Sequence, residues 1–509
     1  MPLAALALLL AQAAVESGSI EVRSVDALTG QPVAGAPIYL NGPAKAVSGK
    51  TGEDGRASFT DLPMGVYPVA TFGVPGYNRA SNPVRLTPKD AKAVVRLAMY
   101  PESEIAGRVL DSRGEPVAGV SVTAVRFGYV GSRPGIVSFH GALTDDSGVY
   151  RIRRLLPGRY TLVAQPRVLP GFLEGEVEAR TYFAGSPTRP GATPLLIAPG
   201  EKREPVDIAL LRTPSTCLSG QVAEVPGSAN GTIRLYDADA ETGAPLGSAP
   251  IEPTGEFEFC GLPEGTYQVH ATASGDGGPL SGSSGPVAVL DRAVRAPPIP
   301  LQPPGPVRGV IQTDERLPPA LRLSLQGVSL RGTFGESLQA RIDLDGTFFI
   351  PAAAAREYWL SVSGLAGGMY VREAKFANRD AWSQPFQPDG SELRIVLEAD
   401  GPTVLGRVER REGEAVGETV VLLAAHDLQA TFPPNQFLST RANFEGEFQI
   451  TGFPPGRYRL LAFTRELPSN ASPSPEWIAA HASRALELDL GPRQTKNVTV
   501  EAVRITHLD

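Results

Sequence analysis

Few side chains of this 509-residue chain have the type and spacing needed for chemistry, and the two cysteines are the most specific of them. Cys217 and Cys260 lie within one domain's length of each other. In an oxidising compartment such a pair predicts a disulfide, which would stabilise its domain by roughly 4 kcal/mol on the chain-entropy model. Two buried free thiols are the alternative. A metal site is disfavoured, because two thiols with no nearby histidine make a poor zinc ligand set.

The histidines and acidic pairs form no catalytic motif. None of the histidines is followed by Glu at the offset of a zinc-peptidase motif; they are His140, His270, His426, His481 and His507. The sequence has no G-x-S-x-G elbow, P-loop or G-x-G-x-x-G. Asp145-Asp146 is interpreted as a turn former, since calcium needs about six to eight oxygen ligands. We therefore predict no catalytic residue, metal or cofactor, and no enzymatic activity.

Isolated aromatic residues offer a different chemistry, the stacking of exposed rings on sugars. The candidates are Trp359, Trp382, Trp477, Tyr129 and Tyr182. Trp359 follows a tyrosine that is expected to face a core, so its own ring is expected to face outward. The alternative for each ring is packing of a loop against the end of a domain.

A sequence pattern that occurs five times predicts the secondary-structure elements that position these residues. A glycine in a polar turn is followed 12 residues later by a tyrosine. The pairs are Gly55 and Tyr67, Gly148 and Tyr160, Gly255 and Tyr267, Gly346 and Tyr358, and Gly446 and Tyr458. In four copies a second glycine lies 10 residues after the first: Gly65, Gly158, Gly265 and Gly456. This fixed spacing indicates one structural unit used repeatedly.

The unit is predicted to be a β-hairpin. Glycine permits a positive φ in the turn, and the residues after it alternate between apolar and polar, as in a strand with one buried face. A Leu-Pro pair, as in Leu62-Pro63 and Leu262-Pro263, then ends the strand, because proline cannot donate to a β-ladder. The tyrosine starts a returning strand, with its ring in the core and its hydroxyl near the rim.

The five units predict an all-β chain of five tandem antiparallel β-sandwiches with almost no helix. After a signal peptide at 1–14, we place repeats one to five at 16–99, 100–213 (with long loops), 214–302, 303–399 (degenerate) and 400–504. A Gly/Ser-rich loop is expected from Ser274 to Gly285. The segment from Pro475 to Leu486 around Trp477 is the one helix candidate.

Repeat two carries the motifs of a known family in order. They are Gly107-Arg108-Val109, Gly114-Glu115-Pro116-Val117-Ala118-Gly119, Thr144-Asp145-Asp146-Ser147-Gly148 and Leu156-Pro157-Gly158-Arg159-Tyr160. This stretch resembles a carboxypeptidase regulatory-like domain, a transthyretin-like sandwich related to starch-binding-like modules and to the B-type repeats of bacterial collagen adhesins. The resemblance implies tandem sandwich domains of a bacterial exported protein. It implies no particular function, since this fold serves many roles. The Lys-Asn cross-link of adhesin repeats is not expected, because the opening strands offer arginine instead of lysine.

The N-terminus and the charge bear on compartment and partner. An apolar block, Leu3 to Leu10, precedes Ala11-Gln12-Ala13, a pattern typical of a cleaved signal peptide. The block departs from a standard signal peptide in having no lysine or arginine before it. A buried first helix is the alternative, but a strand pattern begins at once with Ser19-Ile20-Glu21-Val22 and leaves nothing for such a helix to pack on. No other stretch is long and apolar enough for a transmembrane helix. The net charge of −7 argues against a nucleic-acid partner.

Two functions from different classes follow. The first is a non-catalytic structural, adhesive or partner-binding rod of the cell envelope, located in the periplasm, on the outer cell surface or secreted. The second is a carbohydrate-binding protein that uses exposed aromatic rings. The expected partner is accordingly a protein or a polysaccharide of the cell envelope.

Overall fold

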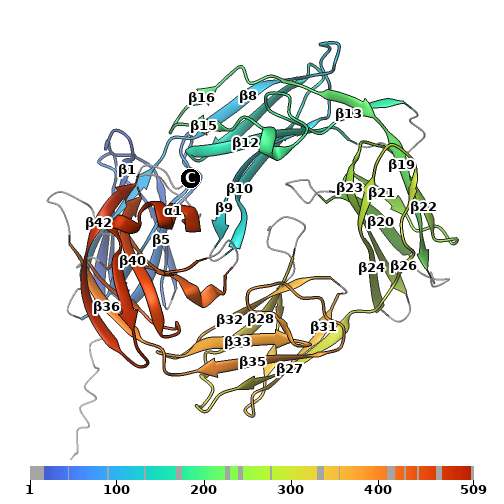
Figure 1. Ribbon diagram of the computed structural model, residues 1–509. Helices are drawn as coiled ribbons and strands as arrows, with labels where there is room; N and C mark the ends of the chain where they lie inside the picture. The colour runs from blue at the N-terminus through green and yellow to red at the C-terminus, as the bar shows by residue number, and fades with distance from the viewer. Residues whose placement is uncertain are drawn as a thin grey trace, which may run out of the picture. The chain divides into compact units, whose positions relative to one another are not determined.

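The computed structural model is built almost wholly of strands, as Figure 1 shows. It describes residues 17–505 except 44, 89–90, 131–132, 168–174, 224–229, 239–244, 276–277, 329–336, 355, 410–418, 429–431, 444–445 and 466–472. The predicted signal peptide lies outside the described residues. Contacts divide the chain into two units: residues up to 104 with 153–157 and 197–203, and the remainder. Repeat one lies in the first unit, repeats three to five lie in the second, and repeat two contributes residues to both. The five domain boundaries stay a proposal.

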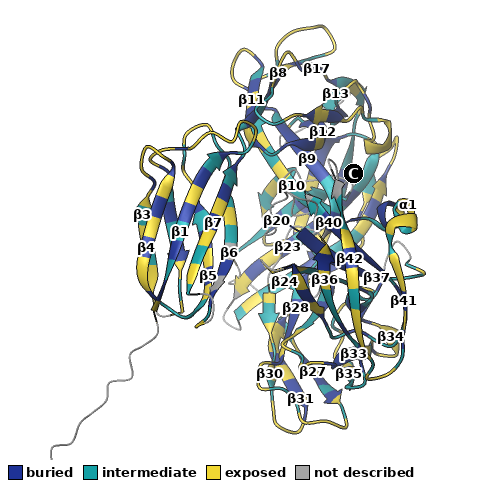
Figure 2. Ribbon diagram, turned by 90° about the vertical axis from the view of Figure 1, so that its left-hand side faces the viewer, coloured by how far each residue is buried: buried dark blue, intermediate teal, exposed yellow. Residues whose placement is uncertain are grey.

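Repeat one shows the basic architecture, two sheets facing each other. Its strands are β1 (Ser17–Asp26), β2 (Pro37–Asn41), β3 (Ala46–Lys50), β4 (Arg56–Pro63), β5 (Gly65–Thr71), β6 (Ala80–Leu86) and β7 (Lys92–Met99). They form sheets ordered β4-β1-β7 and β3-β2-β5-β6. Ile20 and Val22 of one sheet pack with Ile38 and Tyr67 of the other. Buried and exposed residues alternate along β1 and β7, as Figure 2 shows, because successive side chains point to opposite faces.

Repeat two uses the same order with longer strands and added short ones. It comprises β8 (Ser103–Leu110), β9 (Ser121–Val130), β10 (Arg133–Leu143), β11 (Val149–Leu155), β12 (Gly158–Gln165), β13 (Glu176–Ala179), β14 (Thr181–Tyr182), the 3-10 turn η1 (Arg189–Gly191), β15 (Leu195–Ile197), β16 (Lys202–Arg203), β17 (Ile208–Ala209) and β18 (Leu211–Pro214). The sheets run β11-β8-β16, with β17 also on β8, and β10-β9-β12-β14, with β15 on β12. β13 and β18 form a separate antiparallel ribbon.

Repeat three repeats this plan. Its strands are β19 (Thr216–Ala223), β20 (Asn230–Asp237), β21 (Gly247–Pro250), β22 (Glu256–Leu262), β23 (Gly265–Gly275), β24 (Gly278–Val289), β25 (Val294–Arg295) and β26 (Ile299–Pro300). The sheets are β22-β19-β25, with β26 on β19, and β21-β20-β23-β24. The prediction of a loop from Ser274 to Gly285 is therefore wrong, because most of this segment belongs to the paired strands β23 and β24. Cross-strand pairing overrides the low strand propensity of glycine and serine.

Repeat four exchanges one strand between its sheets. It comprises β27 (Gly305–Gln312), β28 (Arg322–Gly327), β29 (Ser337–Gln339), β30 (Arg341–Ile342), β31 (Thr347–Ala353), β32 (Tyr358–Ser363), β33 (Tyr370–Phe376), β34 (Arg379–Asp380) and β35 (Glu392–Glu398). The sheets are β30-β31-β27-β35-β33-β34 and β29-β28-β32. In repeats one and three the strand after the tyrosine strand pairs with it; here β33 pairs with β35 instead.

Repeat five closes its two halves into one sheet. It comprises β36 (Thr403–Glu409), β37 (Thr419–Ala425), η2 (Pro434–Gln436), β38 (Phe437–Arg441), β39 (Glu447–Ile450), β40 (Gly456–Arg465), α1 (Pro475–Ala480), η3 (Ala482–Arg484), β41 (Leu486–Leu490) and β42 (Thr495–Ile505). The order is β38-β37-β40-β42-β36-β39, since β42 pairs with both β36 and β40. The predicted helix is confirmed as α1, with the Ser474 hydroxyl capping the Trp477 amide.

The fold class predicted from the sequence, tandem antiparallel β-sandwiches, is confirmed. One kind of pairing was not predicted. In every repeat the first strand lies parallel to a closing strand, as in β1 with β7 and β36 with β42. The described part of the chain has no helix long and apolar enough to cross a membrane.

Candidate functional site

The five turn glycines have the conformation that their sequence context predicted. Their φ values, from Gly55 to Gly446, lie between 70° and 87°, the left-handed region that favours glycine. The turns are also held by side chains. In repeat two the Asp145 carboxylate accepts hydrogen bonds from the amides of Ser147 and Val149, both at 2.9 Å. Asp145 is thus engaged in forming the turn.

The five tyrosines are buried, with exposed fractions of at most 3%. Three hydroxyls donate to the carbonyl of the proline four residues earlier: Tyr67 to Pro63 at 2.7 Å, Tyr267 to Pro263 at 2.8 Å and Tyr458 to Pro454 at 2.7 Å. The Tyr358 hydroxyl instead accepts from the Ala354 amide at 2.9 Å. Each bond ties the tyrosine strand to the turn before it, as a tyrosine corner does.

Burial changes the titration of these phenols. Desolvation raises the pKa of Tyr67 and of Tyr458 above the usual value. Tyr150 lies two residues after the turn glycine of repeat two. Its pKa is raised for the same reason, and its hydroxyl donates to the Val206 carbonyl. These groups therefore stay neutral at physiological pH, which suits a packing role.

A left-handed backbone conformation recurs six residues after the turn glycine. The residue there has a positive φ in four repeats: Asp61 (57°), Arg154 (61°), Gly261 (74°) and Gly452 (85°). In repeats one and three the register between the opening strand and its partner shifts at this point. Two of these positions hold non-glycine residues in a conformation that disfavours a Cβ.

A glycine of the opening strand lies under an aromatic ring in three repeats. The pairs, with the distance from an ideal Cβ to the nearest ring carbon, are Gly220 and Phe257 (2.4 Å), Gly309 and Phe348 (2.3 Å), and Gly406 and Phe448 (2.2 Å). Each pair is directly opposite in the strand register. Repeat one has the inverse combination, Val22 opposite Ala57. Both combinations fill the same space with one large and one small residue.

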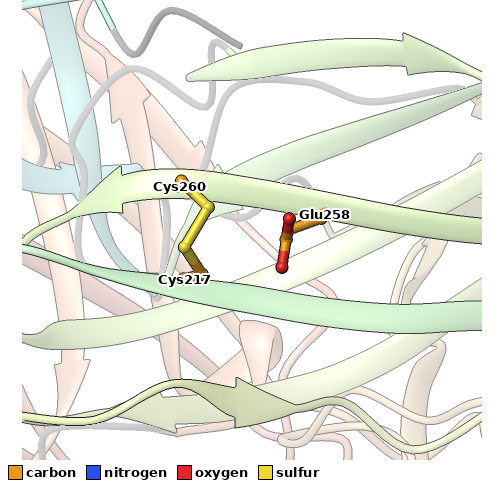
Figure 3. Close-up of side chains that lie close together, drawn as sticks. All are labelled: Cys217, Glu258 and Cys260. Atoms are coloured by element: carbon orange, nitrogen blue, oxygen red, sulfur yellow. A yellow bond between two sulfur atoms is a disulfide. The ribbon is translucent and has the colours of Figure 1, made fainter. Parts of the chain in front are cut away.

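Cys217 and Cys260 are joined in a disulfide, as Figure 3 shows. They lie on neighbouring strands, β19 and β22, at the bulge of repeat three. Glu258 lies beside them, and the three side chains form the only group of three metal-ligating types found in the described part of the chain. The sulfurs are bonded to each other, so neither offers a thiolate to a metal.

Four of the five candidate aromatic residues are buried, which differs from the exposure that sugar stacking needs. The exposed fractions are 1% for Tyr182, 5% for Trp382, 7% for Trp477 and 8% for Tyr129. The Trp382 indole donates to Asn435 Oδ1 at 3.3 Å, and Trp477 stacks on His481. Trp359 on β32 is half-buried. The alternation of residues in the sequence did not reveal this burial, because it depends on residues distant in the chain: Trp477 and Tyr129 lie in one apolar cluster with Phe463 of β40.

The described histidines do not gather into a site. Burial lowers the pKa of His140 and, together with the charge of Arg356, that of His270. His426 contacts the Asp427 carboxylate at 2.8 Å, and His481 contacts the Trp477 carbonyl at 2.8 Å. His507 lies outside the described residues.

One polar pair was not anticipated from the sequence. Arg180, just after β13, forms an ion pair with Asp237 at the end of β20, and both side chains are mostly buried. They line a cavity of about 860 Å³ together with Glu178, Cys260 and Tyr267. Arg180 stands in an insertion of repeat two and Asp237 in repeat three, so no local spacing joins them. The lining includes no arrangement of nucleophile and base.

The comparison with protein families agrees with the sandwich fold of repeat two. The family model of the carboxypeptidase regulatory-like domain matches residues 104–189. No curated protein sequence matches the chain. The Bacillus anthracis TIE protein is 16% identical over 56% of this chain, with a TM-score of 0.18, and the chain spans half of that protein's length. The minor pilin GBS52 of Streptococcus agalactiae is 17% identical over 42% of this chain and 100% of its own, with a TM-score of 0.24.

A third similar structure is BcpA, the major pilin subunit of Bacillus cereus, at 11% identity over 56% of this chain and 99% of its own, with a TM-score of 0.16. These likenesses are distant, and the family match covers one repeat. Within that repeat the turn glycine Gly148 and the buried Tyr160 occupy the positions that the resemblance implied. Residues 104–189, within repeat two, match the carboxypeptidase regulatory-like domain family.

Proposed function

We propose that this chain is a non-catalytic, exported multi-domain protein that acts as a structural or adhesive element and binds a protein partner of the cell envelope. The proposal rests on the structural role of the residues that recur in each repeat. The turn glycines, the buried tyrosines and the glycine–aromatic pairs all serve the fold of each repeat. The feature that recurs is therefore the fold itself. A chain of five such domains suits a spacer or a binding surface.

The connections between repeats support a spacer. Only residues 399–402 separate β35 of repeat four from β36 of repeat five. Within them the Asp400 carboxylate accepts from the Tyr370 hydroxyl at 3.0 Å, and the Asp400 carbonyl accepts from the Arg493 amide at 2.6 Å. A Cβ at Gly401 would lie 2.6 Å from the Gly368 carbonyl and 2.7 Å from that of Phe453. This connection is bonded to both repeats rather than free.

Export is part of the proposal and has its own support. The apolar block and the Ala11-Gln12-Ala13 pattern at the N-terminus are typical of a signal peptide. The Cys217–Cys260 disulfide suits an oxidising compartment. Mass spectrometry of the protein from its native host should find an N-terminus near residue 14 and no free thiol. A retained Met1 together with two free thiols would contradict export.

The function is tested by chemical crosslinking in the native envelope, followed by capture of the full chain. We expect one or a few envelope proteins in stoichiometric yield. Binding to purified envelope polysaccharide is measured in parallel as the competing outcome. Polysaccharide retention without a crosslinked protein would overturn the proposal in favour of sugar binding, whereas the burial of four candidate rings leads us to expect no retention.

A further inference from the structure

We propose that the chain bears tension along its length, with repeats one, four and five resisting force and repeats two and three opening first. The inference rests on how the first and last strands of each repeat are paired. It deepens the proposed structural role, because a spacer anchored at its two ends transmits force. Each ladder lies within one repeat, so the order in which the repeats open follows from the pairing inside each of them.

Repeat one shows the geometry most fully. β1 and β7 lie parallel over eight register pairs, from Ser19 opposite Lys92 to Asp26 opposite Met99. The chain enters at the Ser17 end of β1 and leaves at the Met99 end of β7, which is the opposite end of the ladder. A pull on the two chain ends therefore slides the strands along each other. All the ladder hydrogen bonds are loaded together, and they are evenly spaced in a parallel pair.

The opposite case is a strand pair pulled from one shared end. Its hydrogen bonds then carry the load one after another, so the pair peels apart at low force. Antiparallel neighbours in sequence, such as β5 and β6, would be peeled in this way if they carried the chain ends. The parallel pairing of terminal strands avoids that arrangement in this chain.

Repeats five and four have the same parallel pairing of their first and last strands. β36 and β42 are parallel over seven register pairs, from Thr403 opposite Thr495 to Glu409 opposite Glu501. β27 and β35 are parallel over five, from Arg308 opposite Glu392 onward. Residues 301–304 lead into β27 and residues 399–402 connect β35 to β36. Such short connections pass a pull directly to the ends of the terminal strands.

Repeats two and three have interrupted ladders. In repeat three β19 has two register pairs with β25 and two with β26, and Pro297-Pro298 lies between the two closing strands. In repeat two β8 pairs with two separate short strands, β16 and β17, with Pro205 between them; β17 has two register pairs with β8. Proline has no amide hydrogen to donate to a ladder. The closing side of these repeats is divided into two short strands, so no continuous ladder shares the load, and we expect them to open at lower force.

The disulfide limits how far repeat three extends. Cys217 is the second residue of β19, and its bond to Cys260 closes a loop with a sequence separation of 43. A pull that enters at Cys217 passes through the sulfur–sulfur bond to Cys260. The enclosed chain stays short, which removes about 150 Å of extension at roughly 3.5 Å per residue. Repeat three would thus yield early but lengthen little.

The test is single-molecule pulling of the full chain between handles at its two ends, with and without reductant. We expect two low-force and three high-force unfolding events. Reduction should lengthen one of the low-force events by about 150 Å, the contour that the disulfide encloses. The Cys217→Ser/Cys260→Ser double variant should show the longer event without reductant. Lengthening of a high-force event, or five events of equal force, would overturn the ranking.

A matched pair of attachment points tests the cause. Both native cysteines are in the disulfide, so introduced cysteines are uniquely reactive without reductant. Ser17→Cys with Glu102→Cys pulls repeat one from opposite ends of the β1–β7 ladder. Leu28→Cys with Glu102→Cys pulls from the same end. We expect the rupture force to be about twofold or more lower for the same-end pair, because forced unfolding follows the unfolding rate of the loaded path.

Equal rupture forces in the two geometries would show that the parallel ladder does not carry the load, and the proposal would fail. Thermal unfolding of both double variants checks that neither attachment pair damages the fold. This failure is distinct from that of the proposed function. Crosslinking to an envelope protein does not depend on force, and a chain that binds no partner still gives a force ranking.

Discussion

The ring of Phe448 on β39 lies against Gly406 on β36, directly opposite in the strand register. A Cβ at Gly406 would come within 2.2 Å of the ring, so the glycine is required by the aromatic neighbour and not by its own backbone. Repeat one fills the corresponding space with Val22 opposite Ala57. The two positions therefore act as one packing unit.

This relationship predicts a compensating pair of mutations. Gly406→Val should destabilise repeat five by about 1–3 kcal/mol through overpacking, and Phe448→Ala by about 3–5 kcal/mol through cavity formation. The double variant should be more stable than the sum of the two losses, because valine fills the space that the ring leaves. Chemical denaturation of the full chain, followed by limited proteolysis of repeat five, measures the cycle. Strictly additive losses would contradict the packing account.

The positions six residues after the turn glycine predict stabilising changes. Asp61 and Arg154 have φ values of 57° and 61°, where repeats three and five have glycine. Asp61→Gly and Arg154→Gly should each stabilise their repeat by up to about 1 kcal/mol, since a Cβ in this conformation costs roughly 1–2 kcal/mol and the added flexibility of the unfolded chain offsets part of the gain. Gly261→Ala should act in the opposite direction. Thermal unfolding midpoints provide the measurement, and a loss of stability in both glycine variants would refute the prediction.

The disulfide predicts a loss confined to one repeat. Reduction of Cys217–Cys260, or the Cys217→Ser/Cys260→Ser variant, should destabilise repeat three by about 4 kcal/mol, the loop-closure value for this separation. Hydrogen exchange resolved by peptide should show faster exchange in β19 and β22 and unchanged exchange in β1 and β7. Uniformly faster exchange along the chain would indicate that the repeats do not unfold independently.

Asp26 predicts a dependence of repeat one on acid pH. Burial acts to raise the pKa of this carboxyl, but hydrogen bonds from the Thr29 and Leu28 amides and the Tyr77 hydroxyl outweigh it, so the pKa is lowered. A lowered pKa in the folded state means that the carboxylate stabilises repeat one above the unfolded value near pH 4. That stability is lost as the pH falls through the folded pKa.

The measurement is the stability of repeat one from pH 6 down to pH 2 in the native chain and in Asp26→Asn. The variant keeps an oxygen acceptor but does not titrate in this range. Its stability should fall less steeply with acid than that of the native chain. Identical slopes would show that other carboxyls govern the acid transition.

The sequence alone determined the local geometry of this protein. Glycine at a turn and tyrosine 12 residues later predicted a positive φ and a buried ring, and both occur in every repeat. The segment from Pro475 around Trp477 was the one helix predicted, and α1 begins at Pro475, its amide end capped by Ser474. Such features depend on a few neighbouring residues, whose steric and hydrogen-bonding preferences act within one turn or strand.

Only the tertiary structure decided which segments meet. Alternation along β33 marks a buried face but does not select β35 over β32 as its partner, and nothing in β1 or β7 specifies their parallel pairing. The same reason explains Trp382, which a residue of the next repeat, Asn435, covers and bonds. Strand partners and ring burial depend on contacts between residues far apart in the chain, and the free energy of those contacts is decided by how the whole core packs.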